Sequence, residues 1–163
     1  MERIDKLIEN PQFKSCMDSI RKEEETRKFC KHDLEHCLDV ARIATIINME
    51  ENFGFKKDVL YATALLHDIG RAQEYAGGDK HSSVGAKLAR TILESCNYSS
   101  DEVKEIVTAI FYHSSKEAVE NKGQRSLSYL LYRADKESRN CFLCAAKDEC
   151  YWPEDTKKHK LTI

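Results

Sequence analysis

The sequence predicts an all-helical domain in which several helices surround one hydrophobic core. The chain has 163 residues, enough for one domain that buries its own core. Hydrophobic residues make up 41% of the chain, and only two prolines interrupt it. Apolar residues recur at the three- and four-residue spacing of amphipathic helices, and no segment alternates apolar and polar residues long enough to predict a strand. We therefore expect a single domain over residues 1–163, built from helices alone.

Helix-breaking residues divide this pattern into separate segments. Breaks are expected at Asn10-Pro11, at 52–54, at 77–79, at 98–100 and at 121–123. Between them the apolar periodicity predicts helices over residues 2–9, 12–26, 33–51, 57–68, 81–96, 100–113 and 126–139.

Charge and targeting features favour a cytoplasmic protein. With 26 basic and 28 acidic residues the net charge is −2, which gives no field to attract a nucleic-acid polymer or an anionic membrane. The longest apolar run, residues 59–66, is too short to span a bilayer, and the first residues lack the apolar core of a signal peptide. Seven cysteines, an odd number, do not suggest a disulfide framework.

Five predicted helices each carry one potential metal ligand at helical spacing from their apolar residues. These ligands are His36, His67, His81, His113 and Asp135. A single histidine on an apolar face is more often a hydrogen-bonded core residue than a ligand. A buried carboxylate, however, is costly unless it is paired, and metal coordination satisfies several buried imidazoles and carboxylates together. Because Asp68 also adjoins His67, the set favours a shared site for Fe, Mn, Zn, Co or Ni.

The order of these residues resembles the HD-domain superfamily of metal-dependent phosphohydrolases. The resemblance rests on His36, the motif Leu-Leu-His-Asp-Ile-Gly at 65–70, and Asp135 within Arg-Ala-Asp-Lys, and it covers about residues 30–140. It implies a bundle of five or more helices around a central metal. The implied ligands of the first metal are His36, His67, Asp68 and Asp135.

A second metal is implied by a further likeness to the binuclear members of that superfamily. His81 and His113 resemble the additional histidines of those members, in which Asp68 would bridge both ions. Residues 114–115 are both serine, whereas some binuclear relatives carry another histidine after His113. One ion and two ions therefore both remain open.

The resemblance implies hydrolysis of a phosphate ester or anhydride, in a nucleotide or another small phosphorylated metabolite. A metal-bound water with a lowered pKa would supply hydroxide as the nucleophile, with Asp68 at the catalytic centre. Arg71, just after the motif, is a candidate for catalysis and for binding the substrate phosphate, and Lys136 and Arg139 are secondary candidates for phosphate binding. For each cation a surface charge is the alternative interpretation. Two other functions stay open: a di-iron oxygenase, which uses the same ligands, and a non-catalytic metal- or nucleotide-binding sensor.

A possible second metal site lies outside the predicted core. Its ligands would be Cys30, Cys141, Cys144 and Cys150. Cys30 is six residues before His36, and Cys141 is six residues after Asp135, so antiparallel helices would carry both thiols about 9 Å in the same direction. A structural zinc or an iron–sulfur cluster would fit such a group, and free thiols are the alternative. On either side of the core over about residues 30–140, we expect N-terminal helices in residues 1–29 and a cysteine-containing C-terminal segment in residues 141–163.

Overall fold

The computed structural model of the chain describes residues 1–115, 118 and 125–161. Its α-helices are α1 (Glu2–Glu9), α2 (Pro11–Glu23), α3 (Leu34–Glu50), α4 (Lys57–Leu66), α5 (Arg71–Tyr75), α6 (His81–Ser95), α7 (Ser100–Tyr112) and α9 (Leu127–Glu137). Short 3₁₀ turns follow: η2 (Cys141–Leu143), η3 (Lys147–Glu149) and η4 (Glu154–Thr156). No strand occurs among the described residues, and the predicted all-helical class is confirmed.

Local capping explains where the helices begin. The Asn10 side chain accepts hydrogen bonds from two backbone N–H groups at the start of α2, and Asp33 accepts one from the backbone N–H of His36 in α3. Ser99 and Glu102 form a reciprocal capping box at the start of α7. The predicted helices match these elements to within a few residues. The break expected at 121–123 lies outside the described residues.

One short helix was not predicted. Helix α5 follows the His-Asp motif directly and has only five residues, too few to show a helical period in the sequence. The helix predicted over 12–26 ends earlier, at Glu23, because the chain turns there and the next residue, Glu24, is buried.

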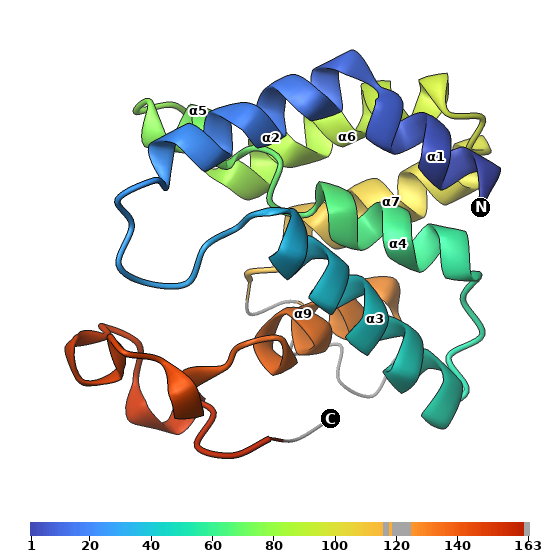
Figure 1. The fold of residues 1–163 in the computed structure, drawn as a ribbon. Coiled ribbons are helices and arrows are strands. Elements are labelled where there is room, and N and C mark those ends of the chain that lie inside the picture. Colours follow the sequence, from blue (N-terminus) through green and yellow to red (C-terminus); the bar gives the residue numbers. More distant parts are fainter. Residues whose placement is uncertain (116–117, 119–124, 162–163) are drawn as a thin grey trace.

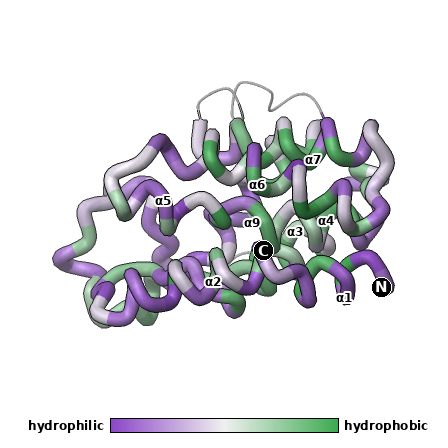
Figure 2. Tube along the Cα trace, turned by 90° about the horizontal axis from the view of Figure 1, so that it is seen from above, coloured by the Kyte–Doolittle hydropathy of each residue, from purple (hydrophilic) through white to green (hydrophobic). Residues whose placement is uncertain are grey.

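Helix α4 forms the centre of the bundle. It packs against α1, α3, α6 and α7, and seven of its ten residues are buried. In Figure 1, α1 and α2 cover one side, with α6 behind them, while α3 and α9 form the opposite side. Figure 2 shows the molecule from above, where hydrophilic residues prevail along α1 and α2 and hydrophobic residues are more frequent along α4 and α7. Because α4 is surrounded in this way, the residues that follow its last residue, Leu66, lie in the interior of the bundle.

Helices α3 and α9 run antiparallel. At one end, the His36 ring of α3 lies 3.6 Å from the Asp135 carboxylate of α9. At the other end, the Arg125 guanidinium donates to the backbone carbonyl of Asn52. The chain segments that precede α3 and follow α9 therefore leave the bundle at the same end, as Figure 1 also shows. Within the described residues no helix has the length and apolarity that crossing a lipid bilayer would require.

An ion-pair network joins α1 to the starts of α4 and α7. The Arg3 guanidinium donates to Asp58 at 2.8 Å and to Glu102 at 2.6 Å, and it lies over the Tyr98 ring at 4.1 Å from the centroid. The hydrogen bond from Arg3 lowers the pKa of Glu102 to about 2, against the opposing effect of desolvation. The ionised form of Glu102 is thus preferentially stabilised by folding.

We expect Glu102→Gln to lower the free energy of unfolding by about 1 kcal/mol at pH 7, because it removes the charge but keeps a capping side chain. The folded pKa lies below the ordinary value of 4.5, so this contribution is present above pH 4.5 and is lost as the pH falls toward 2. Urea unfolding of EDTA-treated wild-type and variant protein from pH 7 to pH 3 should therefore give curves that converge below pH 4.5. Glu94→Gln, an exposed change on α6, is the control; a difference that grows on acidification would contradict the assignment.

Candidate metal centre

The end of α4 places the His-Asp motif in the core. The helix ends at Leu66, and the next two side chains are almost wholly buried, His67 at 0% and Asp68 at 3% exposure. Two residues later the chain passes so close to the first turn of α6 that a Cβ on Gly70 would lie 2.2 Å from the carbonyl oxygen of His81. The absence of a side chain at Gly70 therefore lets His81 approach Asp68.

One group of potential ligands joins α3, α9 and the end of α4. His36, His67 and Asp135 offer atoms that all lie within 4.8 Å of one another. The Nε2 atoms of His36 and His67 are 3.3 Å apart, and Asp135 Oδ1 is 3.6 Å from His36 Nε2. Asp68 Oδ2 borders this group, at 3.0 Å from His67 Nε2.

A second group of ligands faces the other oxygen of Asp68. It consists of Asp68, His81 from the start of α6 and His113 just after α7, again with ligand atoms within 4.8 Å of one another. Asp68 Oδ1 lies 3.6 Å from Nε2 of each histidine, and the two Nε2 atoms are 3.3 Å apart. Asp68 therefore stands between the two groups, with one carboxylate oxygen toward each.

The histidine rings are oriented as metal ligands require. Each is held through Nδ1 by a neighbouring group, which leaves Nε2 directed at the centre. The Nδ1 contacts run from His67 to the carbonyl oxygen of Ala64 (2.7 Å), from His113 to that of Ile110 (2.6 Å), from His81 to Glu74 (2.7 Å) and from His36 to the Ser138 hydroxyl (3.3 Å). Four imidazoles thus turn Nε2 toward two carboxylates.

The electrostatics of the centre also fit cations. Burial, together with the neighbouring charges, lowers the pKa of His36 and of His81 to about 4 each, so both rings are neutral near pH 7 and can bind a metal. Burial alone would raise the pKa of Asp68, but His67 and Arg71 outweigh it and hold the carboxyl ionised. Among the described groups, buried Asp68 Oδ1 has no hydrogen-bond partner. An ionised, unsatisfied oxygen between two histidine nitrogens is a natural cation ligand.

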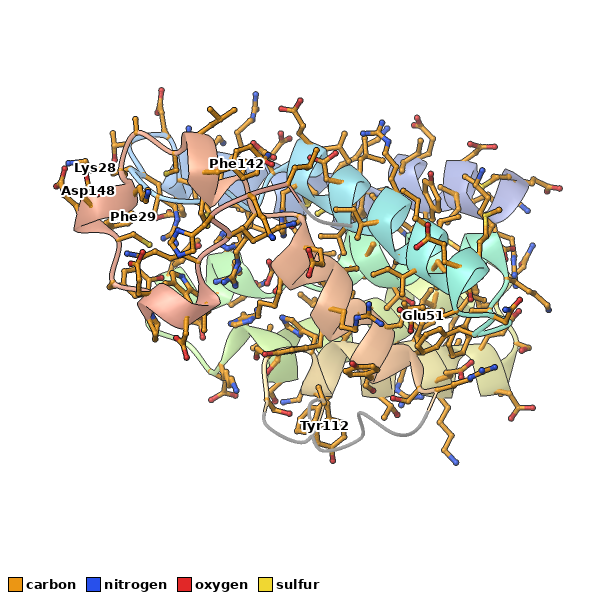
Figure 3. All side chains as sticks on the ribbon, turned by 90° about the horizontal axis from the view of Figure 1, so that it is seen from below. Lys28, Phe29, Glu51, Tyr112, Phe142 and Asp148 are labelled. Carbon is orange, nitrogen blue, oxygen red and sulfur yellow. The ribbon has the colours of Figure 1, made fainter. Side chains whose placement is uncertain are left out.

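Residues of α3, α5, α6 and α9, together with two irregular segments, line a cavity of about 800 Å³ beside these ligands. His36, His81, His113 and Asp135 lie on its wall, and so do side chains from residues 27–35 and from the segment after α9. Figure 3 shows Lys28 and Phe29 beside Asp148 of the C-terminal segment, at one end of the molecule. The two segments contact each other. Lys28 Nζ donates to Glu149 at 2.6 Å, and the ring of Phe29 packs against that of Tyr151 with centroids 5.6 Å apart.

The three basic residues proposed from the sequence to bind phosphate line this cavity, and each contacts a carboxylate of the centre. Arg71 Nε lies 2.8 Å from Asp68 Oδ1 without hydrogen-bond geometry, so the contact is an ion pair. Lys136 Nζ is 2.6 Å from Asp135 Oδ2, and Arg139 approaches the same oxygen at 3.9 Å. Arg139 also lies over the Trp152 ring, at 3.9 Å from its centroid.

One buried cluster next to the centre was not found by sequence reasoning. The His32 ring points Nε2 at Asp68 Oδ2 from 4.0 Å, while its Nδ1 contacts Glu24, which also accepts a hydrogen bond from the Tyr75 hydroxyl. The hydrogen bonds from His32 and Tyr75 lower the pKa of Glu24 to about 2 in spite of its burial. The four-residue spacing from His32 to His36 is a signal in the sequence for a shared helical face, whereas no spacing connects Glu24 with Tyr75.

The cysteines fall into two sets. Cys16, Cys37 and Cys96 are buried in the hydrophobic core. The other four, Cys30, Cys141, Cys144 and Cys150, are partly or fully exposed and line the cavity. They do not form one of the groups of ligand atoms within 4.8 Å that the described residues contain.

Comparisons with known proteins agree with this geometry. A family model described as "HD domain" matches residues 33–146. A protein of Clostridium beijerinckii described as "Uncharacterized protein" is 40% identical over 161 residues, which cover 99% of each chain. Ribonuclease Y of Pseudothermotoga lettingae is 37% identical over 62 residues, 38% of this chain and 12% of that protein. Ribonuclease Y of Petrotoga mobilis is 31% identical over 83 residues, 51% of this chain and 14% of that protein. No solved structure matches significantly.

Proposed function

We propose, from the premise that the chain belongs to the HD-domain family, that it hydrolyses a phosphate ester or anhydride in a nucleotide or a similar small metabolite. HD domains are generally metal-dependent phosphohydrolases. The observation that carries the proposal is the placement of Asp68 between two groups of imidazole and carboxylate ligands. Ligands of both groups lie on the wall of a cavity that carries many basic residues.

The ligand set supports two divalent cations. His36, His67 and Asp135 would hold one, His81 and His113 the other, and Asp68 would contact both. Cations bound there would bring the pKa of a coordinated water toward neutrality and polarise a phosphoryl oxygen. The protein's own groups fix the ligand rings, exclude bulk water from the buried carboxylates and present positive charge to the substrate.

The residues of the cavity wall favour a small, multiply charged anion as the substrate. Its basic residues are Arg27, Lys28, Lys31, Arg71, Lys136, Arg139, Lys147 and Lys157. The whole chain has a net charge of −2, so this concentration of cations is local. Phe29, Tyr151 and Trp152 add aromatic rings on which a nucleobase could stack. A volume of about 800 Å³ is in the range for small-molecule sites.

The function is tested by a hydrolysis screen on freshly purified protein, after its metal content has been measured. Phosphate monoesters, nucleotides, dinucleoside polyphosphates and a short RNA would each be incubated with Mn²⁺, Fe²⁺, Co²⁺, Ni²⁺ or Zn²⁺. The RNA is included because two similar proteins are named ribonuclease Y. We expect phosphate release or nucleotide cleavage that EDTA abolishes. Oxygen uptake coupled to substrate oxidation would contradict the proposal, and so would nucleotide binding without turnover under every metal.

Once a substrate is found, Arg71→Ala should raise KM by about tenfold or more, since it removes a charge-assisted contact to a phosphate. Metal content should stay at the wild-type level because Arg71 is not among the grouped ligands. Arg21→Ala on the exposed surface of α2 is the matched control, with unchanged KM expected. An unchanged KM in the Arg71 variant would exclude this residue from substrate binding. A loss of metal with unchanged KM would show instead that Arg71 only supports Asp68.

A further inference from the structure

The four cavity-lining cysteines come from two segments that leave the bundle at the same end. Cys30 precedes α3, and Cys141, Cys144 and Cys150 follow α9, which runs antiparallel to α3. Residues close to Cys30 and Cys150 also connect the two segments, through Lys28 with Glu149 and Phe29 with Tyr151. Cys30 and Cys141 both line the cavity, although each lies outside the helix from which its position was predicted.

Tight turns connect the three C-terminal cysteines. The backbone N–H of Cys144 donates to the carbonyl oxygen of Cys141 at 3.2 Å, and the N–H of Cys150 donates to that of Lys147 at 3.3 Å. The N–H of Lys147 in turn donates to the carbonyl oxygen of Cys144 at 3.2 Å. This irregular segment packs no large apolar side chain into the hydrophobic core. The described contacts of this segment with Lys28 and Phe29 therefore lie outside the hydrophobic core.

The thiols lie close enough to affect one another. Burial raises the pKa of the Cys30 thiol, although the residue as a whole is exposed to solvent. Arg139 opposes this rise, and Cys141, Cys144 and Cys150 all add to it. Four neighbouring thiolates repel one another electrostatically. Binding to a shared cationic group offsets this repulsion.

A single zinc ion and a [4Fe–4S] cluster require different spacings between their four thiolates. Four thiolates on one Zn²⁺ ion, each at about 2.3 Å, must lie roughly 3.8 Å from one another. The described residues contain no such compact group of cysteines. In a [4Fe–4S] cluster each thiolate binds a different iron atom, so the sulfurs stand further apart than around one zinc ion. We propose that Cys30, Cys141, Cys144 and Cys150 bind a [4Fe–4S] cluster on the wall of the cavity.

Nearby cations suit the charge of such a cluster. Each thiol releases its proton to solvent when its sulfur bonds to iron, and four thiolates around a cluster core of charge 2+ give a net charge of 2−. Arg139 acts on Cys30, and Lys157 interacts electrostatically with Cys150. The cluster would join the segment before α3 to the segment after α9, and so would fix the wall that carries Tyr151 and Trp152 beside the metal centre.

The test separates cluster iron from iron in the metal centre. The Asp68→Ala protein, which keeps all seven cysteines, would be purified without oxygen and assayed for iron, zinc and acid-labile sulfide. It would then be reconstituted with Fe²⁺ and sulfide. We expect about four iron and four sulfide per chain, with visible absorption that bleaches on reduction by dithionite. Zinc without sulfide, or no sulfide even after reconstitution, would overturn the proposal.

Cysteine variants in the same background locate the cluster. Cys30→Ser and Cys144→Ser change different segments, and each should lose most of the sulfide. Cys16→Ser, in the core, should keep it. Circular dichroism and Mn²⁺ binding by the same cysteine variants with Asp68 intact would verify that the bundle remains folded. Full sulfide retention in both cavity variants would overturn the assignment even if iron is present.

Discussion

Replacing Asp68 with alanine is expected to remove both metal ions and to reduce phosphohydrolase activity by on the order of 10³-fold or more, because metal ions contribute several kcal/mol to the stabilisation of the transition state. Each oxygen of this carboxylate faces a different group of histidines, at distances between 3.0 and 3.8 Å. Asp68 is grouped with His81 and His113, and its other oxygen borders the group of His36, His67 and Asp135. The same change also removes the partner of Arg71.

Metal analysis of variants distinguishes a bridging role from a role at one ion. Wild-type protein should contain about two ions per chain, His81→Ala about one, and Asp68→Ala close to none. Asp18→Ala, which changes an exposed carboxylate on α2, should keep both ions and full activity. Two retained ions in the Asp68 variant would contradict the shared ligand. One ion in the wild type that is unaffected by His81→Ala would leave a mononuclear enzyme.

Gly70→Ala is expected to destabilise the protein by at least about 3 kcal/mol and to move His81 away from Asp68. The added Cβ would lie 2.2 Å from the carbonyl oxygen of His81 and 2.6 Å from the backbone nitrogen of Gly85. Both are backbone atoms and cannot rotate aside. The first turn of α6 would therefore have to shift, and it carries a ligand of the second ion.

The matched control lies on the other side of the same contact. A Cβ on Gly85 would meet its nearest neighbours at 3.5 to 3.7 Å, which is ordinary van der Waals contact. Gly85→Ala should therefore be tolerated, and it could gain up to about 1 kcal/mol because alanine is the better helix former. Urea unfolding and metal content of the two variants are the measurements. Equal stability of Gly70→Ala and wild type would show that the two backbones are not in such close contact.

Much of the fold was predictable because helical periodicity is local. The apolar spacing and the breaks at Asn10-Pro11 and Ser99 gave the helices to within a few residues, and the caps found there explain why. The same periodicity placed His36 and His113 on inward faces. Helix α5 was missed because five residues are too short for a periodic signal.

The sequence by itself determined which residues point inward, and therefore the set of potential ligands, because side-chain direction follows from helical phase. Only the tertiary structure decided that Asp68 lies between two groups, that Arg71 pairs with it, and that Glu24 holds His32 beside it. These relations depend on how separate helices pack, above all on the close approach of Gly70 to α6. Helical phase fixes the face that a residue occupies, whereas its neighbours across the core are fixed by packing between segments far apart in the chain.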